Sequence, residues 1–345
     1  MPESSHRRAQ AVGAGKLIKS RFRPEARSVL YQALIAVAVC LAAGYFVGNA
    51  VDNLAARRIA GGFGFLWREA GFEIGETTLL AYHAGDTYLR AIAVGFLNTF
   101  RVATLAIFFS TIFGMLIGLA RLAPNWLLAK LASAYVEVLR NVPLVVQLFF
   151  WYALITESLP APAEALSPLP GVFLSNRGIA FPTLTADLRF ALDYPVLSGF
   201  NFSGGGSLSP EFAALFLGLA LYTAAFIGEI VRAGILSVER GQFEAARSLG
   251  LSGRQVMRYI ILPQALRVIV PPLTSQYLNC AKNSSLAVAI GYPDLVAIAN
   301  TTINQTGQAI EGIATIMLVY LAISLAISSL MNWYNARIGL RGAKS

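Results

Sequence analysis

The sequence predicts an all-α polytopic membrane protein with about six transmembrane helices. Hydrophobic residues make up 56% of the chain and charged residues only 13%, whereas soluble domains carry roughly a quarter charged residues. Mean hydropathy is +0.60. Six apolar segments approach the length of about 20 residues that a helix needs to cross a bilayer. The net charge of +9 comes from basic residues scattered between these segments, which disfavours a nucleic-acid-binding face.

The six predicted spans fall into two groups. Segments 29–51, 102–120 and 313–332 carry no charged residue. Segments 131–154, 210–236 and 262–285 carry charges, respectively Glu137 with Arg140, Glu229 with Arg232, and Lys282. Because charge within hydrocarbon is costly, the second group should face protein or a water-filled path. The third member also contains Pro271-Pro272, which we expect to form either a hinge or a static kink.

The distribution of lysine and arginine orients the spans. Basic residues crowd the N-terminal arm (Arg7, Arg8, Lys16, Lys19, Arg21, Arg23, Arg27), segment 240–267 and the C-terminal tail. The positive-inside rule places all three in the cytoplasm. The predicted organisation is a cytoplasmic arm (1–27), an extra first helix (28–51), a periplasmic loop (52–90), a core (91–336) with a periplasmic insertion (159–210) and a cytoplasmic loop (237–261), and a cytoplasmic tail (337–345).

Three polar or mixed segments are not expected to cross the membrane. Segment 159–210 is rich in proline and contains Gly204-Gly205-Gly206, so it predicts irregular structure. Segment 291–308 is rich in Asn and Thr and predicts a re-entrant or outward-facing turn. The aromatic stretch 63–67, within the loop 52–90, favours a position at the membrane interface.

The loop between the fourth and fifth spans predicts two short helices. Residues 242–249 suit a helix that ends at Gly250, where glycine adopts a left-handed conformation at little cost. Ser252 can cap a second helix, and Pro263 should stop or kink it. The two alanines at 245 and 246 predict a flat surface that enters a groove, with apolar anchors beside it. The residues expected to make this contact are Phe243, Glu244, Ala245, Ala246, Arg247, Gly250 and Leu251.

The spacing of these residues carries a resemblance. The loop is similar to the EAA loop of ABC importer permeases in the spacing of Glu244-Ala245-Ala246, Gly250 and Ile260-x-Leu262-Pro263. The alternative is an ordinary amphipathic loop helix with a glycine cap. Two further stretches, from Glu137 to Leu148 and from Lys282 to Leu295, resemble core segments of the polar amino-acid permeases (HisM/GlnP-like). The extra first helix and the long outer loops are most similar to the general L-amino-acid subgroup, the Aap/Bzt type.

This resemblance implies a type I ABC importer permease in a bacterial inner membrane. It implies a homologous second permease subunit in a heterodimer, an ATPase dimer docked on the EAA loop, and a periplasmic binding protein. The L-amino acid would cross by alternating access. ATP and Mg would bind the ATPase, since the chain lacks G-x-x-x-x-G-K-[ST], so neither enzyme activity nor a bound cofactor is expected of this chain.

A polar stripe suggests where a substrate passes. Gln276, Asn279, Lys282 and Asn283 share a helical face, and Ser284 follows them. Lys282 could hold a carboxylate and Glu229 an ammonium group. The alternatives are interhelical hydrogen bonding for the stripe and a pair between Glu229 and Arg232.

Two other functions are alternatives on the sequence alone. An ABC permease for another small polar solute fits the same motifs. An ion-driven secondary transporter would favour inverted repeats and intramembrane acids, and it leaves the EAA pattern unexplained. The isolated His6 and His83, together with Cys40 and Cys280 in apolar stretches, predict neither a metal site nor a disulfide.

Overall fold

The computed structural model describes residues 26–56, 61–184 and 192–340. The predicted basic arm up to residue 25 and the tail from residue 341 lie outside this range. The chain divides into two compact units, residues 1–61 and 62–345. In the first unit, α2 (Ala26–Ala56) is a single helix whose apolar stretch Val29–Asn49 is long enough to cross a membrane. The predicted first span is therefore confirmed as a helix.

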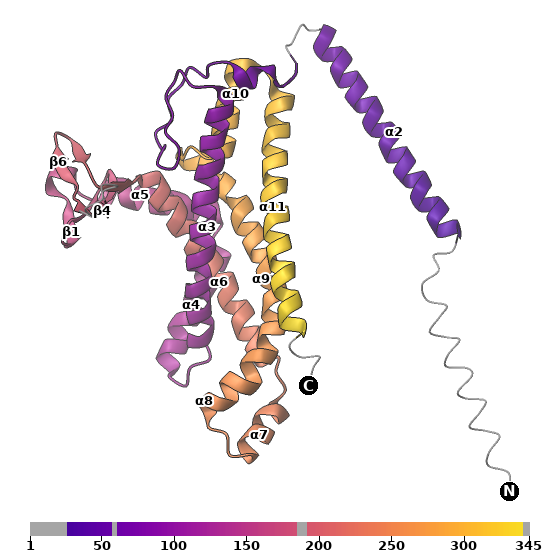
Figure 1. Cartoon of the computed structure of the whole chain (residues 1–345). Helices are drawn as coiled ribbons and strands as arrows, with labels where there is room; N and C mark the ends of the chain where they lie inside the picture. The colour runs from indigo at the N-terminus through magenta and orange to yellow at the C-terminus, as the bar shows by residue number, and fades with distance from the viewer. Residues whose placement is uncertain (1–25, 57–60, 185–191, 341–345) are drawn as a thin grey trace. The chain divides into compact units, whose positions relative to one another are not determined.

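The second unit is built on four long helices (Figure 1): α3 (Tyr88–Ala120), α6 (Pro210–Leu236), α9 (Leu262–Asn283) and α11 (Ala309–Leu340). Neighbouring helices in the bundle are α3 with α6, α6 with α9, and α9 with α11. Within the described residues, five helices have the length and apolarity of a span, or six if the bent pair α4–α5 counts as one. The helical membrane architecture is confirmed.

Helices α3 and α6 approach closely through small residues. A Cβ atom on Gly114 would lie 2.6 Å from the Cβ of Ile227, and one on Gly118 would lie 2.7 Å from the Cβ of Val231. The backbones therefore meet where α3 presents no side chain, as small-residue pairs in membrane helices allow. Gly114-x-x-x-Gly118 is thus part of the α3–α6 packing.

The predicted span 131–154 is not one unbroken helix. The segment forms α4 (Trp126–Asn141) and α5 (Leu144–Ser158), which meet at a bend of 106°. Pro143 causes the break, because proline lacks an N–H and forces the preceding Val142 into an extended conformation (ψ 127°). The Gln147 amide donates to the carbonyls of Leu139 (2.9 Å) and Val142 (3.0 Å). One side chain thereby caps the end of α4 from within α5.

The insertion between α5 and α6 contains β-strands and is not irregular as predicted. One antiparallel sheet is formed by the strands β1 (Leu166–Leu169), β2 (Val172–Ser175), β3 (Gly178–Phe181) and β8 (Gly206–Leu208). Two small pairs join β4 (Thr183–Leu184) to β5 (Leu192–Asp193), and β6 (Val196–Ser198) to β7 (Asn201–Ser203). Gly171, between β1 and β2, has φ +78°, and Gly204, between β7 and β8, has φ +74°. These two glycines mark turns between very short strands, whereas Pro168, Gly178 and Gly206 lie within strands.

At the end of the bundle where α3 begins, the segment predicted as a turn contains a helix. α10 (Leu295–Thr306) follows the 3-10 helix Ser284–Ile290. Asp294 caps it by accepting from the Ala297 amide at 2.8 Å, and Gly307 (φ +73°) ends it. Its threonines bond back to carbonyls four residues earlier, as Thr302 does to Ile298 (2.9 Å), so a polar composition is compatible with helix here.

Segment 62–87 packs onto this same end. Its 3-10 helix (Phe63–Trp67) buries Phe65, which lies in one apolar cluster with Tyr82, Tyr88 and Leu295. The aromatic stretch thus contributes a core residue, although Trp67 stays exposed. Together with α10, the segment forms a folded layer over the start of α3.

At the opposite end, α7 (Arg240–Ser248) and α8 (Gly253–Val256) form the predicted pair of short helices (Figure 1). Pro263 does not stop the second one. The chain passes through a π-helical turn (Met257–Ile261), in which the Leu262 amide donates to the Met257 carbonyl, and continues into α9. The wider turn changes the hydrogen-bond register, so proline at the start of α9 is accommodated.

Candidate functional site

The α7–α8 loop (residues 237–261) is held by well-formed caps. Gly250 has φ +79°, the left-handed conformation that favours glycine. The Gly250 amide donates to the Arg247 carbonyl (2.9 Å) and the Leu251 amide to the Ala246 carbonyl (3.2 Å), which is a Schellman motif. Ser252 and Gln255 form a capping box at the start of α8. The loop is therefore a structured protrusion with a fixed shape.

The loop presents only part of the predicted contact set. Ala246 is 4% exposed and packs against Val256 and Ile261. This corrects the expectation that both alanines form an outward surface, because the helix period turns one of each adjacent pair inward. Leu251 is half-buried in the same cluster. The outer face consists of the exposed Phe243, Glu244, Ala245, Arg247, Gly250 and, at 82% exposure, Leu249.

Glu229 belongs to a three-membered charge cluster near the α7–α8 end. Its carboxylate pairs with Arg232 one turn on (2.6 Å) and with Arg121, which follows α3. Arg121 also donates to Ser133 on α4 (3.3 Å). The pairing alternative for Glu229 is therefore what the structure shows. A role of Glu229 in binding an ammonium group stays a prediction.

The predicted polar stripe lies on an open side of α9. Asn279 and Lys282 are exposed, and Gln276 and Asn283 are half-buried. Ser284 lies off this surface, because it is fully buried and its hydroxyl donates to the Ala281 carbonyl (2.7 Å). In the structure, Glu229 and the stripe are not joined by any hydrogen bond or ion pair between described residues.

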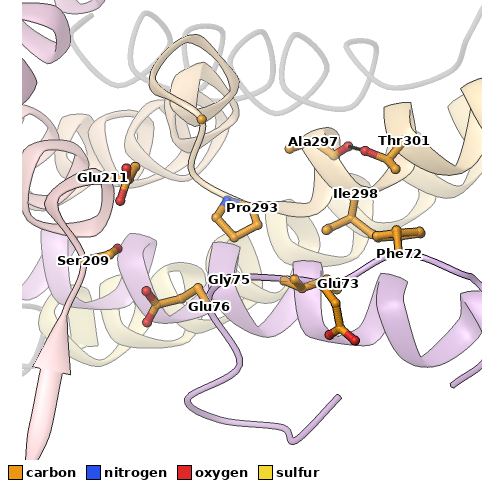
Figure 2. A pocket seen from close by; sticks show the side chains of 12 residues that line it. Phe72, Glu73, Gly75, Glu76, Ser209, Glu211, Pro293, Ala297, Ile298 and Thr301 are labelled. Atoms are coloured by element: carbon orange, nitrogen blue, oxygen red, sulfur yellow. Dashed lines mark hydrogen bonds between the residues drawn. The ribbon is translucent and has the colours of Figure 1, made fainter. Parts of the chain in front are cut away.

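A second feature, which the sequence did not single out, is a cavity of about 480 Å³ at the α10 end (Figure 2). Glu211 and Ser209 come from the start of α6, whereas Glu73 and Glu76 come from the segment before α3, and Pro293 and Ile298 from the α10 region. The cavity thus gathers carboxylates from distant parts of the chain.

Glu76 is engaged in a buried network. It is 6% exposed and pairs with Arg101 at 2.8 Å, whose guanidinium lies 4.4 Å from the Phe212 ring centroid. Asn98 donates to the carbonyls of Glu76 (2.9 Å) and Pro293 (3.0 Å). The only sequence signal was Arg101, a charge directly before the predicted span 102–120. Glu76 and Phe212, the partners of Arg101, are distant in sequence and are brought to it only by tertiary packing.

Comparison with known proteins identifies the family. Residues 110–340, more than half of the chain, match the family described as "Binding-protein-dependent transport system inner membrane component". The match includes the α7–α8 loop, α9 and the α4–α5 bend. This chain belongs to that family.

Several relatives match this chain over more than nine tenths of both sequences. It is 46% identical to the Escherichia coli K12 putative amino-acid ABC transporter permease protein YhdX, with 97% of this chain and 99% of the relative covered. It is 42% identical to the general L-amino acid transport system permease protein AapQ of Rhizobium johnstonii, covering 92% and 94%. The glutamate/glutamine/aspartate/asparagine permease protein BztB of Rhodobacter capsulatus is 36% identical, covering 91% and 94%.

Solved structures confirm the permease fold. An amino acid ABC transporter crystallised with histidines has a chain that is 29% identical, with TM-score 0.53, covering 72% of this chain and 95% of that one. A chain of the MetNI methionine ABC transporter in an inward-facing conformation, at 17% identity and TM-score 0.50, covers 72% and 97%. The second likeness supports the type I importer fold alone.

Proposed function

We propose that this permease carries polar L-amino acids across the inner membrane by alternating access, driven by a separate ATPase that docks on the α7–α8 loop. The observation that carries the proposal is the loop itself. The loop is a capped protrusion with exposed Phe243 and Leu249 beside Glu244. The chain that carries it belongs to a binding-protein-dependent transporter family. An apolar anchor within a polar rim is the arrangement that compact interfaces use.

The proposed assembly contains a homologous second permease subunit, an ATPase dimer that binds ATP and Mg, and a periplasmic binding protein. Both termini and the α7–α8 loop face the cytoplasm, and the α10 end faces the periplasm. The amino-acid cargo is supported by relatives whose names specify general L-amino acids or glutamate, glutamine, aspartate and asparagine. The stripe Gln276–Asn279–Lys282–Asn283 lines part of the path in this proposal.

The test combines ATPase capture with uptake. The transporter is reconstituted with its partner subunits and binding protein, and uptake of labelled L-glutamine and the other common L-amino acids is measured. Glu244→Arg should reduce both co-purification of the ATPase and ATP-dependent uptake at least tenfold, because it replaces the one acidic side chain on the exposed face of α7 with a basic one.

Glu164→Arg is the matched control, since it makes the same charge change at an exposed position between α5 and β1. Normal ATPase binding and normal uptake in Glu244→Arg would refute the docking assignment. No uptake of any common L-amino acid by the wild type would refute the cargo assignment.

A further inference from the structure

A cavity of about 410 Å³ opens beside α4, in the half of the bundle nearer the α7–α8 loop. It is referred to below as the α4 cavity. Its lining includes Glu137, Arg140 and Asn141 from α4, Arg121 from the end of α3, and Phe226 and Glu229 from α6. The volume falls within the range of about 300–1,000 Å³ typical of small-molecule sites. Charges of both signs thus line one space of ligand size.

These charges divide into an engaged pair and an unengaged pair. Arg121 and Glu229 are ion-paired with each other, and Glu229 has a second partner in Arg232. Glu137 and Arg140 are both exposed, and neither forms an ion pair or a side-chain hydrogen bond with another described residue. The acceptor Glu137 and the donor Arg140 therefore remain available to a ligand, while Arg121 and Glu229 are already ion-paired in the cavity wall.

Arg140 is also oriented for binding. Its guanidinium carbon lies 4.9 Å from the centroid of the Phe226 ring. Stacking on an aromatic face restrains the guanidinium plane and leaves its in-plane N–H groups able to bind a carboxylate with two parallel hydrogen bonds. Arg140 lies in the last turn of α4, where the helix dipole favours a cation.

The position of the unengaged pair is consistent with a polar ligand site, because both side chains face the cavity. An ionised side chain within a membrane-spanning bundle is costly unless it faces a water-filled cavity or meets an opposite charge. Glu137 and Arg140 are three residues apart and therefore neighbours on one helix face, yet they do not pair with each other. A molecule that carries one cation and one anion a few bonds apart would satisfy both.

We propose that the α4 cavity is an amino-acid site, in which Arg140 binds the α-carboxylate and Glu137 binds the α-ammonium group. This inference rests on the proposed function and adds to it a site separate from the stripe on α9. The backbone groups of the ligand are recognised, and its side chain extends past Asn141. A site of this kind accepts many L-amino acids, because it holds only the part that they share.

The experiment measures binding to the whole membrane complex, assembled with its partner subunit and ATPase but without the binding protein. Three probes are used: L-glutamine, L-glutaminamide, which lacks the carboxylate, and N-acetyl-L-glutamine, which lacks the ammonium group. The variants are Glu137→Gln and Arg140→Gln, with Glu157→Gln, an exposed residue of α5, as the matched control.

The expected result is selective. Arg140→Gln should weaken L-glutamine binding at least tenfold and leave the already weak binding of L-glutaminamide unchanged. Glu137→Gln should do the same for L-glutamine while leaving N-acetyl-L-glutamine unchanged. Glu157→Gln should bind all three probes as the wild type does.

Other results would overturn the proposal. They are wild-type binding in both variants, equal losses for every probe, or loss of the second permease subunit from the complex, which would make these residues subunit contacts. A wild-type complex that imports L-glutamine but does not bind it without the binding protein would also overturn it. If the wild type imports no amino acid, the proposed function itself fails, and that outcome is distinct from all the others.

Discussion

Asp294 is a carboxylic acid whose side chain is shielded from solvent. It is fully buried, and one of its oxygens accepts the Ala297 amide at the start of α10. Burial raises the pKa of Asp294 to about 7, although backbone hydrogen bonds at the cap partly oppose this. The cap and the charge therefore conflict, because capping requires only an acceptor whereas ionisation requires solvation.

This conflict predicts a pH dependence of stability. The pKa of Asp294 is higher in the folded chain than the ordinary value of 3.8, so the folded state holds the proton more tightly. Stability should fall as pH rises from about 4 to 7, with a slope approaching 1.4 kcal/mol per pH unit from this group. Asp294→Asn keeps a capping acceptor and should unfold at a higher temperature than the wild type at pH 8.

The measurement is thermal unfolding of the detergent-solubilised protein at pH 5 and pH 8. The gain from Asp294→Asn should shrink at pH 5, where the wild-type carboxyl is largely neutral. Asp86→Asn serves as the control, because Asp86 is a half-buried residue of the same end of the bundle. A gain that is equal at both pH values would contradict ionisation as the cause.

At the scale of elements, Gly250 governs the shape of the α7–α8 loop. A Cβ atom there would meet nothing within 4 Å, so any cost of substitution comes from its positive φ alone. Gly250→Val should destabilise the loop conformation by about 1–2 kcal/mol and weaken ATPase binding. Gly241→Val is the control, since Gly241 is equally open and has no positive φ. Equal ATPase binding by the two variants would show that docking does not depend on the Schellman motif.

The contact between α3 and α6 makes a second prediction for elements. A Cβ atom on Gly118 would lie 2.7 Å from the Gly228 carbonyl oxygen, and backbone has little room to move. Gly118→Leu should cost at least 1–3 kcal/mol by overpacking and lower the thermal unfolding temperature. Ala322→Leu, which adds one carbon fewer beside an apolar cavity of about 310 Å³, should be tolerated. Equal losses would show that bulk alone is the cause.

For the whole molecule, the proposed orientation can be tested by labelling from either side. Cysteines are introduced at Ser248, on α7, and at Glu164, next to the β-strands, after Cys40 has been changed to serine. Cys280 is kept, because it is 1% exposed. A membrane-impermeant maleimide should label Ser248→Cys only in inverted vesicles and Glu164→Cys only in intact spheroplasts. Labelling of both from one side would contradict the assignment of the two ends.

Local patterns in the sequence predicted most of the bundle and the α7–α8 loop. Apolar length located the spans, and Gly250 with Ser252 located the loop's caps, since these effects act within a few residues. The bend at Pro143 was missed because hydrophobicity continues across it. Ala246 was misplaced because its burial depends on Val256 and Ile261 across the loop. The partners of Arg101 and Glu229 lie far away in sequence, and spacing carries no information about them.

The bend between α4 and α5 requires a side chain at position 147 that can donate two hydrogen bonds. Gln147 uses both N–H bonds of its amide to hold two carbonyls, and glutamate has the same shape but no such donors. Across the family, we therefore expect natural variation at this position to exclude glutamate, even though the two side chains differ only by an NH2 group in place of an oxygen. An alignment in which glutamate replaces glutamine freely beside a retained Pro143 would indicate that the bend is held by other means.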